Sequence, residues 1–103
     1  MIKFDRFQLS NGLRVLVHED HSTPMAVVNV LYDVGARDED PTKTGFAHLF
    51  EYLMFGGSVN IEDFETPLQL AGGENNAYTI NDFTNYYIQL PAENIEMAFY
   101  LES

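Results

Sequence analysis

The hydrophobic and polar positions in the first third of the chain alternate as they do in β-strands. Apolar residues lead up to Asn11-Gly12, and a second alternating run follows over residues 13–17. An Asn-Gly pair between two such runs predicts a hairpin, because both residues tolerate a left-handed backbone. A third run over residues 26–34 is nearly continuously apolar and β-branched. This composition is typical of a central strand that is covered on both faces.

The middle of the chain changes to a helical period. Residues 35–44 are charged and predict a loop, in which Thr44 is a candidate cap for the next element. Apolar residues then recur at spacings of three and four, which predicts a helix with a buried stripe that ends at Gly56-Gly57. The members of this stripe are Phe46, Leu49, Phe50, Leu53 and Met54. A second helix is expected over about residues 61–70, before another glycine pair.

The last third of the chain returns to strands. Residues 76–80 and 83–90 are expected to form two strands, joined by a tight turn at Asn81-Asp82. Pro91 then opens a final helix. The face on which that helix is expected to pack consists of Ile95, Ala98 and Phe99. The order β-β-β-α-α-β-β-α predicts an α+β fold, an antiparallel-rich sheet with helices packed on one side.

Composition and charge exclude several classes of protein. The chain has 103 residues, of which 46% are hydrophobic, so it is one domain or part of one and has enough apolar residues for a core. Its net charge of −11 would repel nucleic acid and an anionic membrane surface. The absence of cysteine excludes disulfides and thiolate metal sites. With no signal peptide and no apolar run of about 20 residues, we expect a cytoplasmic protein.

The residues with the clearest chemistry lie on the first expected helix. His48 and Glu51 are three residues apart and therefore project from the same face. A histidine at position 52 would complete H-x-x-E-H, the inverted zinc-peptidase motif. In that motif two imidazoles hold the metal, and the glutamate between them takes a proton from the metal-bound water. This chain has Tyr52 in place of the second imidazole.

The chain resembles the insulinase/pitrilysin/mitochondrial-processing-peptidase family of zinc metallopeptidases over nearly its whole length. The segments that carry the resemblance are residues 9–15, 35–39, 45–51, 53–57 and 76–79, with Asp82, Thr84 and Tyr86 after them. They occur in the order in which the family has them. The resemblance implies that residues 1–103 are a single partial domain, the N-terminal part of a larger peptidase domain that is truncated at its C-terminus.

The resemblance also implies roles for individual residues. His48 is similar to the family's first zinc ligand and Glu51 to its catalytic base, while Tyr52 stands at the position of the missing second histidine ligand. The third ligand in such enzymes is a glutamate that would lie beyond the end of this chain. Asn76 and Ala77 lie where the edge strand of the family hydrogen-bonds an extended peptide substrate.

Two interpretations of function remain open. The first is a zinc-dependent metalloendopeptidase. In this interpretation the chain itself binds no zinc and is inactive, because Tyr52 replaces one ligand and the third ligand is absent. A phenol binds metal only as phenolate, which is costly at neutral pH because its ordinary pKa is about 10. The alternative is a non-catalytic peptide-binding or scaffolding subunit that partners an active homologue. Expected partners are a peptide or protein substrate, and either a second copy or a homologous domain or subunit.

Other polar residues have simpler structural interpretations. His18 and His21 are expected in a surface segment rather than in a metal site. Tyr52 is equally compatible with filling the core. The acidic run over residues 38–40 is expected to be a solvated loop, with a negative cleft for basic peptides as the less favoured alternative.

Overall fold

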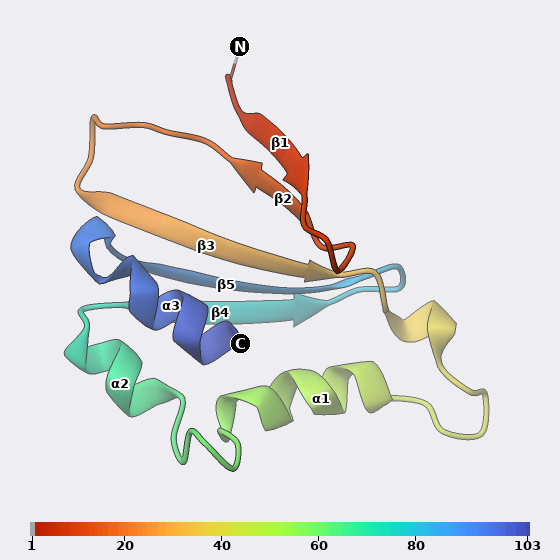
Figure 1. The fold of residues 1–103 in the computed structure, drawn as a ribbon. Coiled ribbons are helices and arrows are strands. Elements are labelled where there is room, and N and C mark those ends of the chain that lie inside the picture. Colours follow the sequence, from red (N-terminus) through yellow and green to blue (C-terminus); the bar gives the residue numbers. More distant parts are fainter. Residues whose placement is uncertain (1) are drawn as a thin grey trace.

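The computed structural model describes residues 2–103 (Figure 1). Strands β1 (Asp5–Gln8) and β2 (Arg14–Val17) form an antiparallel hairpin that is separate from the other sheet. The chain reverses at Gly12, whose φ of +93° favours glycine. The hairpin predicted from Asn11-Gly12 is therefore confirmed.

The second sheet has three antiparallel strands in the order β3-β5-β4. Their bounds are β3 (Met25–Tyr32), β4 (Glu74–Thr79) and β5 (Thr84–Pro91). Strand β5 is in the centre and is the most buried, whereas β3 lies at an edge and has exposed positions along its length. The prediction of a covered central strand at β3 is therefore wrong. A β-branched run reports a preference for extended backbone, and it does not fix the position of a strand within its sheet.

Three α-helices accompany this sheet, and Figure 1 shows them along one side of it. Their bounds are α1 (Phe46–Phe55), α2 (Glu65–Leu70) and α3 (Ile95–Glu102), with short 3-10 helices at Ala36–Asp38 and Ala92–Asn94. Helix α1 contacts β4, and α3 contacts β3 and β5. The predicted element order and α+β class are confirmed. Within residues 2–103, no helix is long and apolar enough to cross a membrane.

The hydrophobic core lies between β5, α2 and α3. Its buried members are Phe64, Leu68, Ile88, Leu90, Ala98 and Leu101. Ala98 is buried as expected, but Phe99 is 58% exposed. Leu101, and not Phe99, is buried on the packed face of α3. Helix α2 begins later than expected, because Asp63 Oδ1 accepts the N–H of Glu65 at 3.1 Å and stabilises a turn before the helix.

The start of α1 and the burial of its apolar stripe both differ from expectation. Both carboxylate oxygens of Glu39 are used at the start, one accepting the N–H of Gly45 at 2.7 Å and the other the N–H of Ala47 at 2.9 Å. Glu39, and not Thr44, therefore satisfies amides at this helix N-terminus. Apart from the partly buried Met54, the stripe is between 44% and 58% exposed. The one buried residue of α1 is Glu51.

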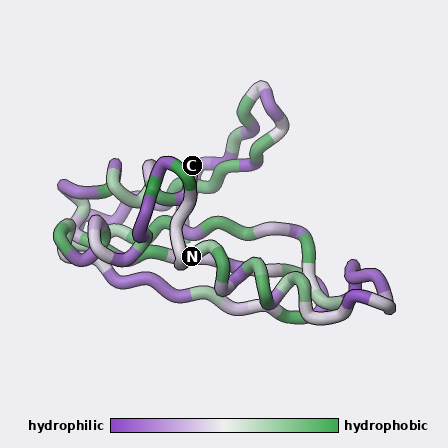
Figure 2. Tube along the Cα trace, turned by 90° about the horizontal axis from the view of Figure 1, so that it is seen from below, coloured by the Kyte–Doolittle hydropathy of each residue, from purple (hydrophilic) through white to green (hydrophobic). Residues whose placement is uncertain are grey.

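Hydrophobic residues of the hairpin are also exposed. In Figure 2 the β1–β2 hairpin projects from the body of the molecule, and hydrophobic positions lie on this hairpin as well as in the body. The exposed apolar residues of this hairpin and its approaches are Ile2, Phe4, Phe7, Leu9, Leu13, Leu16 and Val17. The described chain thus buries a small core and leaves apolar side chains exposed, among other places on the hairpin and on α1.

Candidate metal and peptide site

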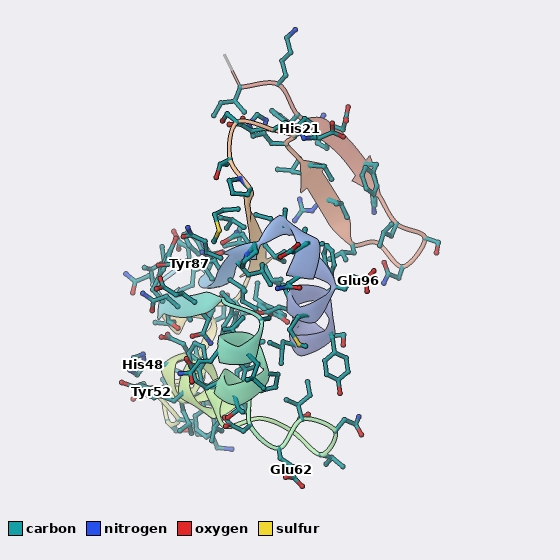
Figure 3. All side chains as sticks on the ribbon, turned by 90° about the vertical axis from the view of Figure 1, so that its left-hand side faces the viewer. His21, His48, Tyr52, Glu62, Tyr87 and Glu96 are labelled. Atoms are coloured by element: carbon teal, nitrogen blue, oxygen red, sulfur yellow. The ribbon has the colours of Figure 1, made fainter. Side chains whose placement is uncertain are left out.

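His48, Glu51 and Tyr52 share one face of α1. His48 Nδ1 lies 3.5 Å from Glu51 Oε2, and the rings of His48 and Tyr52 meet edge to face with 5.0 Å between centroids. Both rings are on the surface, where Figure 3 shows them side by side, and Tyr52 is 66% exposed. The interpretation of Tyr52 as a core residue is therefore wrong. Its ring occupies the open side of α1 next to the imidazole.

Glu51 is held inside the contact between α1 and β4. It is 9% exposed, and its Oε2 accepts a hydrogen bond of 2.5 Å from the hydroxyl of Thr79. A buried carboxylate needs such a donor, because an unpaired charge would lose its hydration without compensation. Burial raises the pKa of the Tyr86 phenol, and the negative charge of Glu51 raises it further. Sequence reasoning missed the contact of Thr79 with Glu51, because no local pattern signals it.

Asn76 and Ala77 lie on β4, at an edge of the three-stranded sheet. They pair with Tyr87 and Tyr86 of β5. The N–H of Ala77 donates to Asn76 Oδ1 at 2.8 Å. Thr79 lies two residues further along the same strand, and therefore on the same face as Ala77. One strand thus carries both the residues expected to hold a peptide and the donor to Glu51.

The loop before α1 joins the helix to the turn between β4 and β5. The backbone N–H groups of Ala36 and Arg37 donate to the carbonyls of Ile80 and Asn81, at 3.1 and 2.9 Å. Arg37 also lies 3.1 Å from the carboxylate of Asp82. Together with the cap on α1, these contacts show that the acidic loop has a structural role as well as being solvated.

An apolar cleft of about 500 Å³ lies between α1 and the strands β3 and β5. Phe50 and Leu53 of the exposed stripe line one wall, together with the partly buried Met54. The opposite wall includes Tyr32 and Tyr86. This cleft explains why Phe50 and Leu53 are exposed. The helix turns its apolar face towards the sheet but does not close against it.

The residues of this chain do not by themselves fit a zinc site. In the described part of the chain, no three histidine, aspartate or glutamate side chains come together as a metal-binding group. The candidate face supplies one imidazole from His48 and the carboxylate of Glu51, beside the phenol of Tyr52. His18 and His21 are exposed as expected, and Figure 3 shows His21 at the opposite end of the molecule from His48.

Comparison with known proteins identifies the family. Residues 14–101 match the model of the insulinase family, peptidase family M16. The chain is 35% identical to the zinc protease PqqE of Helicobacter pylori in an alignment that covers 96% of this chain and 23% of that protein. It is also 35% identical to a probable mitochondrial-processing peptidase subunit beta of Arabidopsis thaliana, over 87% of this chain and 17% of that protein.

The fold agrees with this relationship. The crystal structure of a protease from Helicobacter pylori matches with a TM-score of 0.91 at 34% identity, covering 97% of this chain and 25% of that one. The chain therefore spans a quarter or less of the length of these relatives. Because the family model matches most of its residues and the fold agrees, the chain belongs to the insulinase family of peptidases.

Proposed function

We propose that this chain is the N-terminal part of the peptidase domain of a zinc-dependent metalloendopeptidase, and that as it stands it neither retains zinc nor cleaves peptides. Relatives named as zinc proteases support the parent activity. The observation that carries the proposed inactivity is the position of Tyr52. Its exposed ring lies beside His48, where the family resemblance places a second imidazole.

Two parts of a peptidase remain in the chain. The carboxylate of Glu51 is held by Thr79 and would accept a proton from an attacking water. The edge of β4 at Asn76 and Ala77 would pair with a peptide in extended form, a mode of binding that reads the peptide backbone. These parts explain how a chain that has lost a metal ligand could still bind a substrate.

The zinc content of the purified protein tests this proposal. Elemental analysis should find far less than one zinc per chain in the unsubstituted protein. Tyr52→His restores the second imidazole and should raise the retained zinc, whereas Tyr52→Phe is a matched control that adds no ligand and should not. An unsubstituted chain that retains one zinc, and loses it in Tyr52→Phe, would overturn the proposed inactivity.

A non-catalytic subunit is the second candidate function. The uncovered apolar cleft and the open edge of β4 favour it, because both could serve a partner without any chemistry at Glu51. Cleavage of a fluorogenic peptide separates the candidates when Tyr52→His is made in the complete protein. Restored cleavage supports a peptidase with one altered ligand, whereas peptide binding without cleavage supports the subunit.

A further inference from the structure

We propose that Thr79 is a positioning residue, whose hydroxyl fixes the orientation of the Glu51 carboxylate and so links the peptide-binding strand to the proton acceptor. This inference rests on the proposed role of Glu51. The contact that carries it is the 2.5 Å hydrogen bond from Thr79 Oγ1 to Glu51 Oε2, which joins β4 to α1.

The contact distinguishes the two oxygens of Glu51. Oε2 accepts the hydroxyl of Thr79 and is also the oxygen 3.5 Å from His48 Nδ1. Among residues 2–103, no side-chain or backbone donor is hydrogen-bonded to Oε1. The Thr79 hydroxyl therefore selects Oε2 as the structural oxygen and leaves Oε1 to act on a substrate or a water.

The donor is itself held firmly. A β-branched side chain has few rotamers, so the Thr79 hydroxyl has little freedom once its backbone is fixed. That backbone pairs with Thr84 of β5, and the Thr84 hydroxyl in turn donates to the carbonyl of Val34 at 2.8 Å. The N–H of Ile80, the next residue, donates to the carbonyl of Phe83 at 3.0 Å. The end of β4 is thus held by pairing with the start of β5 and by the hydrogen bond within the turn that joins the two strands.

The position of Thr79 on β4 gives the contact a second consequence. A peptide that adds to the edge at Ala77 would extend the sheet two residues away from the donor to Glu51. Strand β4 would then hold the substrate and orient the carboxylate at the same time. Displacement of a catalytic group by about 1 Å can cost roughly 100-fold in rate, so this contact would act on turnover more than on binding.

Three variants test the role of Thr79. Thr79→Val keeps the shape and removes the hydroxyl, and Thr79→Ser keeps the hydroxyl. Thr42→Val is the matched control, because the Thr42 hydroxyl bonds Asp40 in an exposed loop. In the 103-residue chain, NMR should detect a hydroxyl proton of Thr79 that exchanges slowly and correlates with the Glu51 side chain. We expect loss of this signal and a shift of the Glu51 carboxyl carbon in Thr79→Val alone, with the amide spectrum reporting that each variant is folded.

A turnover measurement complements the spectrum. In the complete protein carrying Tyr52→His, Thr79→Val should lower kcat by roughly 10- to 100-fold at nearly unchanged KM, and Thr79→Ser should recover most of it. An unchanged carboxyl resonance in Thr79→Val, or unchanged kcat in a protein that turns over, overturns the positioning role. If Tyr52→His gives no turnover at all, the proposed peptidase function fails, and the spectrum alone still decides whether Thr79 orients Glu51.

Discussion

Glu102 should make the stability of this chain fall as the pH rises. Its side chain lies at the end of α3 and lines a small pocket together with Tyr32, Met54 and Phe64. Its Oε2 is buried, and within the described residues it has no hydrogen-bond partner. Burial raises the pKa of this carboxyl from its ordinary value of 4.5 to about 7. The protonated form is therefore the one that suits the folded chain.

The direction and size of the effect follow from proton linkage. Between pH 4.5 and 7 the folded chain keeps a proton on Glu102 that the unfolded chain has released, so stability decreases as pH increases. Below this window Glu102 is protonated in both states, and its contribution to the free energy of unfolding is fully present. Above the window Glu102 is ionised in both states, and that contribution is fully lost. The largest possible loss is about 3 kcal/mol. Because Glu102 is only partly buried, solvent screening reduces the expected loss to about 1–2 kcal/mol.

Urea unfolding followed by circular dichroism at pH 4.5 and pH 8 measures this effect. Glu102→Gln has nearly the same shape and no charge, so it should be about 1–2 kcal/mol more stable than the unsubstituted chain at pH 8, with a smaller difference at pH 4.5. Glu96→Gln changes an exposed glutamate of the same helix and is the control. The reasoning is refuted if the difference in unfolding free energy between Glu102→Gln and the unsubstituted chain does not change with pH.

Two further predictions concern the start of α1 and the open apolar surfaces. Glu39→Ala removes the acceptor for two backbone amides and should lower the free energy of unfolding by about 2 kcal/mol. The control is Glu62→Ala at an exposed position, which should change it by less than about 0.5 kcal/mol. Equal effects of the two substitutions in thermal unfolding would contradict this prediction. The exposed hairpin, the cleft and the open edges of β3 and β4 should cause self-association that increases with protein concentration. Because the net charge of −11 opposes it, association should strengthen in about 0.5 M salt, and sedimentation of a monomer under all these conditions would exclude it.

The order of elements was predictable because its signals are local. Asn11-Gly12 turns the hairpin, Gly56-Gly57 ends α1, and the chain reverses after β4 at Asn81-Asp82. Each signal needs only the conformational preferences of two neighbouring residues. The cap of α1 was not predictable in the same way, because Glu39 reaches Ala47 from eight positions away rather than from the usual cap position.

Burial was predicted less well than order, for a physical reason. The period of three and four in α1 shows that one face is apolar, but it does not show what covers that face. Phe50 and Leu53 line an open cleft, and β3 is an edge strand although its sequence resembles a central one. A chain that spans a quarter or less of its relatives' length can carry the apolar pattern of a larger domain without the elements to cover it.

In the candidate site too, contacts within one helix were predictable from the sequence, whereas contacts between elements were not. The spacing of His48 and Glu51 predicted a shared face, since a helix brings residues three apart together. The contact of Thr79 with Glu51 depends on how α1 lies against β4, and the sequence contains no signal for that.

Polar contacts, together with the packing of Met54 and Phe55 against the core, fix α1 on the sheet of this chain. Glu39 holds its first amides, Thr79 holds Glu51 in its middle, and the loop between β3 and α1 is bonded to the turn after β4. Apolar packing is non-directional and tolerates sliding, whereas hydrogen bonds require particular distances and angles. The geometry around Glu51 can therefore be set while most of the apolar stripe of α1 remains uncovered. A substitution that closes the cleft should stabilise the chain without moving Glu51, whereas loss of the Thr79 hydroxyl should move Glu51 and also lower stability, because the buried carboxylate loses its donor.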